Sequence, residues 1–539
     1  MASEHDIRIR LETLNRIGAA LSSDRDIDVL MERIVEAARS FTQADGVTFY
    51  RKSGDRLSFD LLRNISLDQY RGGSSGLPIN LPDISLHHED GTPNHSLVVA
   101  HAALTGTTVN VGDAYSEPGF DFSGTRAFDA RTGYHSKSFL TVPMKDHAEE
   151  VIGVLQLINA IGPEGEIREF TDADQQLVES LASQAAIALN NRALLEQMAQ
   201  LFESLIHLIN TAIDEKSPYT GGHCERVPTL TMMLAEAAVR TGVGPLAGFT
   251  LDDDDRYELK IAGLLHDCGK ITTPVHVVDK ATKLETLFDR IALVDTRFEV
   301  LLRDAEIAHL KGVLDSSSYQ QRIASLQADR ETLRRSNTGG EFMSDAQVAE
   351  IERIAAHVWR GPDGNLRPLL DAEETMNLCI RRGTLNAAER EIINNHIVMT
   401  IRMLEALPWP PHLRKVPEYA GGHHERMDGK GYPRGLTREQ MSIPARVMGI
   451  ADVFEALTAS DRPYKSAKTL SESIQILGRM KLDQHIDPDL FDVFLRERVY
   501  LDYARQFLDP AQIDRIDWHQ VPGVSAELAD ELSATDPVQ

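Results

Sequence analysis

Apolar residues recur with two different periods along the first 216 residues of the chain. Between residues 9 and 41 they follow near-helical spacing, for example at Ile17, Leu21 and Ile34, which predicts a helix. The period then changes to short β-rich segments separated by Gly, Asp and Ser turns, which predict strands over 46–52, 56–62, 137–144 and 150–159. Pro143 predicts that the third of these strands lies at a sheet edge or ends early.

A long helix is predicted to begin at the capping pattern of Thr171 and Asp174 and to run to Lys216 without Gly or Pro. Ten of its positions alternate by four and three, and eight of the ten are apolar: Leu177, Leu181, Gln184, Ala188, Asn191, Leu195, Met198, Phe202, Leu205 and Ile209. This spacing is typical of a two-stranded coiled coil and predicts a parallel homodimer. The alternative is one amphipathic helix packed on its own domain.

The rest of the chain is predicted to be mainly helical. Residues 285–381 are polar, and SNTGGEFMSD interrupts them in the middle, which predicts an inserted helical hairpin or small subdomain. The tail over 520–539 is expected to be flexible. The predicted limits are 10–190 for an N-terminal domain, 172–215 for the connecting helix and 216–510 for a C-terminal domain.

Composition narrows the possible functions. The chain has 539 residues, of which 42% are hydrophobic and 26% charged, so it is expected to bury sizeable cores. The 56 basic and 82 acidic residues give a net charge of −26, which argues against a binder of nucleic acid or of anionic membranes. Three cysteines suit a reducing cytosol. A charged N-terminus and the lack of any run of about 18 apolar residues predict a cytoplasmic protein without a membrane span.

The N-terminal elements resemble a GAF sensor domain over residues 10–190. The resemblance rests on the element order and on SFLTVPM, EVIGVLQLINA and FTDADQQLVESLASQAAIALNN. GAF domains bind cyclic nucleotides, haem, bilins or other small molecules, and many have no known ligand, so the resemblance implies an unidentified small-molecule ligand. The three cysteines lie at 224, 268 and 379, which excludes a bilin bound by thioether to this domain. Four histidines here are interpreted as solvated loop residues rather than metal or haem ligands: His87, His88, His95 and His101.

The C-terminal half carries the residues with the clearest chemistry. His266 and Asp267 follow an apolar run, and Lys270 lies four residues after His266 on the same helical face. An adjacent imidazole and carboxylate are able to share one metal ion or bridge two. Further candidate ligands are His223, His396, His423, His424 and Asp452. Five histidines and two carboxylates predict a site for two transition-metal ions, and they suit iron, manganese, nickel or zinc rather than magnesium or calcium. Iron or manganese is the expected metal, with nickel or zinc as the alternatives.

These residues lie in motifs that resemble the HD-GYP family, a branch of the HD metal-dependent phosphohydrolases. The matching stretches are HCERV at 223–227, HDCGK at 266–270, HHERMDGKGYPRGL at 423–436 and ARVMGIADVFEALTASDRPYK at 445–465. The resemblance implies an all-α bundle with the site in its core. The expected fold class is therefore multidomain α+β and all-α: a GAF-like mixed sheet with helices, a long connecting helix and an HD-type bundle with a helical insertion.

The resemblance also implies a role for each residue. The first metal would take His223, His266, Asp267 and Asp452. The second would take His396, His423 and His424, with Asp267 bridging the two. Members with a third metal have a glutamate where this chain has Tyr219, so two metals are expected. The long segment between Asp267 and His396 departs from the usual pattern of the family.

The implied reaction is hydrolysis of cyclic di-GMP to linear pGpG or GMP. Asp267 and Lys270 are the expected catalytic residues, and Tyr432, Arg462 and Lys465 the expected substrate contacts. The alternatives are another cyclic dinucleotide, such as cyclic GMP-AMP, or a non-catalytic adaptor that contacts partner proteins through the loop at 421–436. GGEF at 339–342 and EAL at 405–407 and 455–457 resemble signatures of other cyclic di-GMP enzymes, but they lack those folds' strand patterns and are interpreted as coincidental.

Overall fold

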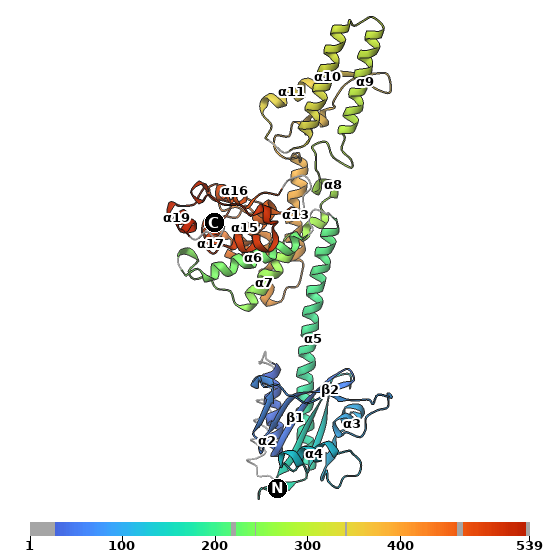
Figure 1. The fold of residues 1–539 in the computed structure, drawn as a ribbon, viewed down its shortest axis with the longest axis vertical. Helices are drawn as coiled ribbons and strands as arrows, with labels where there is room; N and C mark the ends of the chain where they lie inside the picture. Colours follow the sequence, from blue (N-terminus) through green and yellow to red (C-terminus); the bar gives the residue numbers. More distant parts are fainter. Residues whose placement is uncertain (1–26, 217–221, 243, 340–341, 461–466, 535–539) are drawn as a thin grey trace. The chain divides into compact units, whose positions relative to one another are not determined.

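A computed structural model describes residues 27–216, 222–242, 244–339, 342–460 and 467–534. The chain divides into two compact units, Met1–Phe202 and Glu203–Gln539 (Figure 1). The first helix of the described chain is α2 (Ile27–Thr42), which accounts for the C-terminal part of the helix predicted over 9–41. Residues 9–26 of that prediction lie outside the described ranges. Among the described residues no helix is long and apolar enough to span a membrane.

The N-terminal unit is built on one antiparallel sheet with the strand order β3-β2-β1-β7-β6-β5, and β4 and β8 pair with β2 and β7. The strand bounds are β1 (Ala44–Ser53), β2 (Arg56–Asn64), β3 (Gln69–Gly72), β4 (Ile84–Ser85), β5 (Val109–Val111), β6 (Phe139–Lys145), β7 (Val151–Ile161) and β8 (Ile167–Arg168). All four predicted strands are present. They form β1, β2, β6 and β7, with ends that differ from the predicted ones by at most two residues.

The prediction that the strand containing Pro143 is an edge strand is wrong, because β6 lies between β7 and β5. The β5 strand is short and pairs only with Phe139 to Thr141. Beyond Thr141 that side of β6 has no neighbour among the described strands. The missing N–H of Pro143 therefore breaks no ladder hydrogen bond on that side.

Helices cover both faces of this sheet. One face packs on α2 and on the start of α5 (Asp172–Lys216), with Val35 and Leu181 buried against strand residues such as Phe49 and Leu157. The opposite face carries α3 (Val98–Thr105) and α4 (Ser123–Thr132), which pack on smaller apolar clusters. The predicted cap of α5 is confirmed, since Asp174 N donates to Thr171 Oγ1 at 3.2 Å and Thr171 N donates to Asp174 Oδ2 at 3.0 Å.

The heptad stripe predicted on α5 divides into two parts. Leu181 is fully buried in the sheet's own core, and Leu177 and Ala188 pack against it, so this part follows the single-domain alternative. From residue 191 to residue 200 every side chain of α5 is exposed. Only the second part of the stripe is therefore available to a partner helix.

The C-terminal unit is a helical bundle. Its helices around the candidate site are α6 (His223–Arg240), α7 (Asp253–Leu265), η3 (Cys268–Thr272), α8 (Val275–Val278), α13 (Ala387–Glu405), η4 (Pro411–Leu413), α14 (Val416–Gly421), η5 (Arg438–Gln440), α15 (Ile443–Thr458), α16 (Leu470–Leu482), α17 (Pro488–Arg496) and α18 (Val499–Phe507). Buried residues of α15, including Phe454, pack on α6 and α17 in the bundle core.

The predicted insertion forms a substructure with its own hydrophobic core. It contains α9 (Ile291–Leu310), α10 (Ser316–Asn337), α11 (Asp345–Ala355), α12 (Ala372–Leu378) and a small β9–β10 hairpin (Val358–Arg360, Leu366–Pro368) that the sequence pattern did not predict. The tail expected to be flexible after residue 520 instead contains α19 (Ala526–Ala534). Leu528 and Leu532 lie on one apolar face of this short helix, and both are buried.

Candidate metal centre

The seven predicted metal ligands lie together in the core of the helical bundle. They form two groups whose ligand atoms lie within 4.8 Å of one another: His223, His266, Asp267 and Asp452, and His396, His423 and His424. His223 opens α6, His266 and Asp267 follow α7, His396 lies in α13, the His423–His424 pair follows α14, and Asp452 lies in α15. The geometry gives the same grouping as the HD-GYP resemblance implied.

Gly269 explains how the turn after α7 approaches α13. A Cβ atom on Gly269 would lie 2.0 Å from the carbonyl oxygen of His396, so only glycine permits this contact. The Gly269 amide donates a hydrogen bond to Thr400 Oγ1 at 2.9 Å. This close packing holds Asp267 beside His396.

Asp267 lies between the two groups. Its Oδ2 atom is 3.1 Å from His223 Nε2 and 3.3 Å from His266 Nε2. Its Oδ1 atom is 3.1 Å from His396 Nε2. Each carboxylate oxygen therefore faces a different group, which is the arrangement required of a bridging ligand.

Three histidines have their Nδ1 atoms fixed by backbone carbonyls three residues earlier. His266 Nδ1 lies 2.7 Å from Gly263 O, His396 Nδ1 lies 2.5 Å from Ile393 O, and His423 Nδ1 lies 2.6 Å from Ala420 O. A carbonyl only accepts hydrogen bonds, so each Nδ1 carries the proton. Each Nε2 atom is then directed into the centre, where a metal ion would displace any proton that it carries.

Buried polar atoms without partners show that these residues fit a metal. His423 Nε2 and Asp267 Oδ1 are buried and have no hydrogen-bond partner among the described residues. Burial and the neighbouring His424 hold the pKa of His423 well below its ordinary value, so its imidazole stays neutral. Burial likewise lowers the pKa of His424 to about 4. Neutral imidazoles beside ionised carboxylates form a donor set for transition metals.

In the first group, neighbouring charges outweigh burial in setting the pKa values. Burial alone would lower the pKa of His266, but the Asp267 carboxylate outweighs burial and raises it to about 10. Burial would raise the pKa of Asp267, but Lys270 and His266 hold it well below its usual range. Lys270 Nζ forms an ion pair with Asp267 Oδ2. Asp267 is therefore ionised and ready to bind a cation.

The loop at 421–436 folds tightly beside the second group. Tyr432 stacks on His424 with ring centroids 4.9 Å apart and planes inclined by 21°. Buried Glu425 accepts hydrogen bonds from Arg434 N at 2.7 Å and Leu436 N at 2.9 Å. A Cβ on Gly431 would lie 2.4 Å from Arg426 N, so the turn requires glycine there. Arg462, Lys465 and Tyr219 lie outside the described residues.

Family models match both units. A GAF domain model matches residues 26–189, and two HD domain models match residues 220–328 and 372–490. The chain joins a GAF domain to an HD domain of the HD-GYP type. The gap between the two HD matches lies within the insertion of this GAF–HD-GYP chain.

Curated relatives of the GAF–HD-GYP chain are phosphodiesterases. The 3'3'-cGAMP-specific phosphodiesterase 1 of Vibrio cholerae is 46% identical over 79 residues, 15% of this chain and 18% of the relative. The 3'3'-cGAMP-specific phosphodiesterase 3 of the same organism is 23% identical over 321 residues, 60% of this chain and 43% of the relative. A cyclic di-GMP phosphodiesterase of Pseudomonas aeruginosa is 45% identical over 74 residues, 14% of this chain and 17% of the relative. The chain thus spans less than half of each relative's length.

Glu455 is a residue of the HD-GYP site that the sequence pattern did not identify. Its carboxylate is fully buried, and it lies 2.5 Å from His223 Nδ1 and accepts from Arg226 Nε at 2.7 Å. Burial would raise the pKa of Glu455, but His223 and Arg226 hold it below its ordinary value. The carboxylate therefore orients His223 in the way that backbone carbonyls orient His266, His396 and His423. The sequence signal that could have identified Glu455 is its position three residues after Asp452, which places both carboxylates on one side of α15.

The contact of Glu455 with His223 predicts a metal-binding phenotype. Glu455→Gln should weaken metal binding by about 10- to 100-fold, the usual cost of losing a carboxylate behind a ligating histidine. Competition with a chelator of known affinity measures the change. Glu439→Gln, at an exposed position of η5, is the matched control and should bind metal as the parent does. An unchanged metal affinity in Glu455→Gln would contradict this role.

Proposed function

We propose that the chain is a GAF-regulated, metal-dependent phosphodiesterase that hydrolyses a cyclic dinucleotide, with cyclic di-GMP as the favoured substrate. The observation that carries the proposal is the pair of buried ligand groups with Asp267 between them. A site of this kind is suited to hydrolysis at phosphorus. The phosphodiesterase names of the HD-domain relatives support the same reaction class. Because the 3'3'-cGAMP-specific enzymes lie among those relatives, 3'3'-cGAMP is the second candidate substrate.

The proposed roles follow from the positions of the side chains. When bound, two metal ions would lower the pKa of water and neutralise charge on the phosphodiester. Asp267, Asp452 and the five histidines would hold the ions. Lys270, whose Nζ lies at the Asp267 carboxylate, would stabilise negative charge that develops on the phosphate. Tyr432, stacked on His424, would contact the substrate at the edge of the site.

Turnover of a substrate panel tests the proposal. The purified protein, loaded with Mn(II) or anaerobically with Fe(II), is incubated with cyclic di-GMP, 3'3'-cGAMP and cyclic di-AMP, and the products are separated by chromatography. We expect cyclic di-GMP to be opened to pGpG, with GMP appearing only if the linear product rebinds. Preferred cleavage of 3'3'-cGAMP would establish the second candidate. If no cyclic dinucleotide is cleaved, the adaptor function of the loop at 421–436 replaces the enzymatic one.

Arg462 carries a separate prediction from the sequence motif. Arg462→Ala should lower kcat/KM by roughly ten- to a hundred-fold, because it removes one charge-assisted contact to a substrate phosphate. Metal content should not change, since Arg462 is not a proposed ligand. Steady-state kinetics together with metal analysis of the same preparation measures both effects. A variant as active as the parent would remove Arg462 from the proposed substrate contacts.

We also infer that the chain is a homodimer formed through α5. Its exposed part carries positions of the predicted heptad stripe, namely Leu195, Met198 and Leu205, which are 61%, 67% and 48% exposed. Asn191 is a polar position of the same stripe, between Ala188 and Leu195. Apolar residues spaced alternately by four and three are typical of two-stranded coiled coils.

Light scattering on the full chain tests the dimer. The parent should have twice the chain mass at micromolar concentration, and Leu195→Glu should shift it to the monomer, because a charge in the seam would be buried without a partner. Gln197→Glu, at an exposed position of the same helix, adds the same charge outside the seam and should remain dimeric. A monomeric parent would contradict the inference.

A further inference from the structure

The last turn of α5 lies against the turn that follows Asp267. Lys216 is the final residue of α5, and its Nζ donates to the carbonyl oxygens of Lys270 at 3.1 Å and Ile271 at 2.5 Å. Both carbonyls belong to η3, which begins directly after Asp267. Carbonyls at the end of a helical turn carry partial negative charge, which a cation stabilises. Lys216 therefore holds the end of η3 directly.

The same turn of α5 also contacts the segment that carries His223. Cys224 directly follows His223, and its Sγ donates to Asp214 Oδ1 at 3.6 Å. Ile213 is 3% exposed, so this end of α5 is packed into the bundle. The end of α5 thus contacts the segments of two predicted ligands, His223 and Asp267.

The two ends of η3 are held in different ways. Inside the bundle, the Gly269 amide donates to Thr400 Oγ1 at 2.9 Å, and the Lys270 amide donates to the Asp267 carbonyl at 2.9 Å. At the outer end, the Ile271 side chain is 43% exposed, and the Lys216 ammonium reaches the carbonyl of this residue. Lys216 therefore secures the end of η3 that lies toward the surface.

Lys270 depends on the position of this turn. Its Nζ forms an ion pair with Asp267 Oδ2, and its side chain is mostly buried. Its own carbonyl is one of the two acceptors of Lys216, so the backbone and the ammonium of Lys270 are held at opposite ends. A shift of about 1 Å in a catalytic group is enough to cost roughly a hundredfold in rate. Loosening η3 would therefore affect the charge that Lys270 presents.

We propose that Lys216 is a positioning residue for the hydrolysis: it fixes the η3 backbone so that the Lys270 ammonium stays at the Asp267 carboxylate and the substrate phosphate. The inference rests on the proposed function, because the role of Lys270 is defined there. Lys216 lies before residues 220–328 and 372–490, which the HD domain models match. The residue is thus supplied by the connecting helix and not by the HD-GYP motifs.

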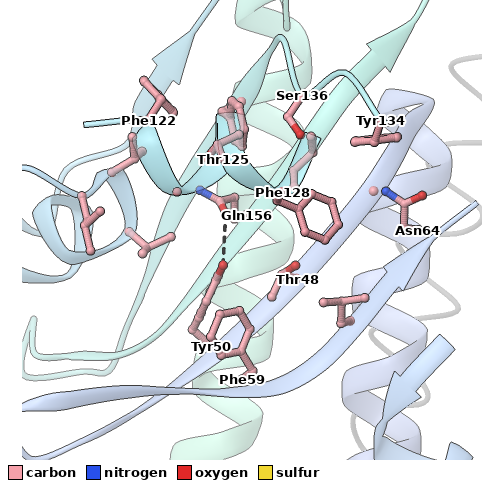
Figure 2. Close-up of a pocket in the computed structure, with 18 of the residues that line it drawn as sticks. Thr48, Tyr50, Phe59, Asn64, Phe122, Thr125, Phe128, Tyr134, Ser136 and Gln156 are labelled. Carbon is pink, nitrogen blue, oxygen red and sulfur yellow. Dashed lines mark hydrogen bonds between the residues drawn. The ribbon is translucent and has the colours of Figure 1, made fainter. Parts of the chain in front are cut away.

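One continuous helix joins this contact to the GAF domain. The first part of α5 packs on the GAF sheet, where Leu181 is fully buried. The opposite face of the sheet lines a cavity, in which Tyr50 donates a hydrogen bond to Gln156 Oε1 at 3.2 Å (Figure 2). A change in the sheet that displaces α5 would act on Lys216, and through it on Lys270.

Steady-state kinetics of the full, metal-loaded chain tests the positioning role. Lys216→Met keeps the length of the side chain but removes its charge and donors, and it should lower kcat by roughly ten- to a hundred-fold. KM should change by less than about threefold, since Lys216 is not a proposed substrate contact. Lys216→Arg keeps a charged donor and should recover most of the kcat. Lys260→Met removes an exposed lysine from α7 and should behave as the parent does.

A double variant shows whether Lys216 acts through Lys270. Lys270→Met removes the group that Lys216 is proposed to position, so adding Lys216→Met to it should lower kcat no further. Effects that multiply in the double variant would indicate general structural damage and overturn the proposal. An unchanged kcat in Lys216→Met, or no recovery in Lys216→Arg, would overturn it as well.

Amide hydrogen exchange followed by mass spectrometry gives a readout that does not require turnover. Lys216→Met should speed exchange in the peptide over 267–273 by about threefold or more, while peptides from α16 exchange as in the parent. If the parent cleaves no cyclic dinucleotide, the proposed function fails, and the exchange rates alone decide on Lys216. Faster exchange over 267–273 would then support its hold on the turn, and unchanged exchange would refute it in either case.

Discussion

Replacing Asp267 by alanine should abolish hydrolysis of the cyclic dinucleotide and remove most of the bound metal. One oxygen of this carboxylate lies 3.1 Å from His223 Nε2 and the other 3.1 Å from His396 Nε2, so its loss breaks both ligand groups at once. We expect kcat/KM to fall by roughly a thousandfold or more, as when the central member of a group of cooperating residues is removed. Metal content per chain and steady-state kinetics, measured on the same sample, follow both losses.

Two further variants separate the role of Asp267 from general damage. Asp267→Asn keeps the side-chain volume and one oxygen but not the charge, and it should also lose metal because the histidines would face a neutral amide. Asp502→Ala removes an exposed carboxylate from α18 of the same unit and should keep the metal content and activity of the parent. Full metal loading and normal turnover in Asp267→Ala would refute the assignment.

The second large effect is a loss of stability when Asp487 is replaced by alanine. This carboxylate is fully buried, and it accepts a hydrogen bond from Arg438 Nε at 2.9 Å and forms an ion pair with Arg446. It also caps α17, because its Oδ1 accepts from Asp489 N at 2.9 Å and Leu490 N at 3.2 Å. Asp487→Ala would leave two guanidinium groups without their shared partner and should lower the free energy of unfolding by about 3–5 kcal/mol.

Tryptophan fluorescence during urea unfolding measures this loss. Trp359, Trp409 and Trp518 all lie outside the GAF domain, so the signal reports on the C-terminal unit alone. Asp489→Ala is the control, since its partly exposed carboxylate pairs with Arg438 at the surface and should cost less than about 1 kcal/mol. A similar small change in Asp487→Ala would show that the network contributes little to stability.

The sequence was sufficient for the main features of the fold and the grouping of the candidate ligands. Strand periodicity located β1, β2, β6 and β7, and the pattern of Thr171 and Asp174 located the start of α5. These signals are local, since each depends on residues a few positions apart. The candidate ligands lie in the two groups that the HD-GYP motifs implied, and those motifs are long and distinctive.

The remaining features depend on contacts between distant segments. Glu455 meets His223 across 232 positions of sequence, and a single carboxylate on a helix carries no sign of such a partner. The division of the α5 stripe depends on where the sheet ends, which spacing along one helix does not encode. The burial of Leu528 in α19 likewise requires a neighbouring surface that the tail sequence alone does not reveal.

Two of the three cysteines allow local opening of the candidate centre to be measured as a rate. Cys224 and Cys268 directly follow the predicted ligands His223 and Asp267, and both thiols are 3% exposed. Burial raises the pKa of both, that of Cys268 to about 11, whereas Cys379 of the insertion is more exposed. A thiol reagent should therefore modify Cys379 first and reach the other two only when the start of α6 or η3 opens locally. The rate of that slower modification measures how often the centre opens, without any substrate or added probe.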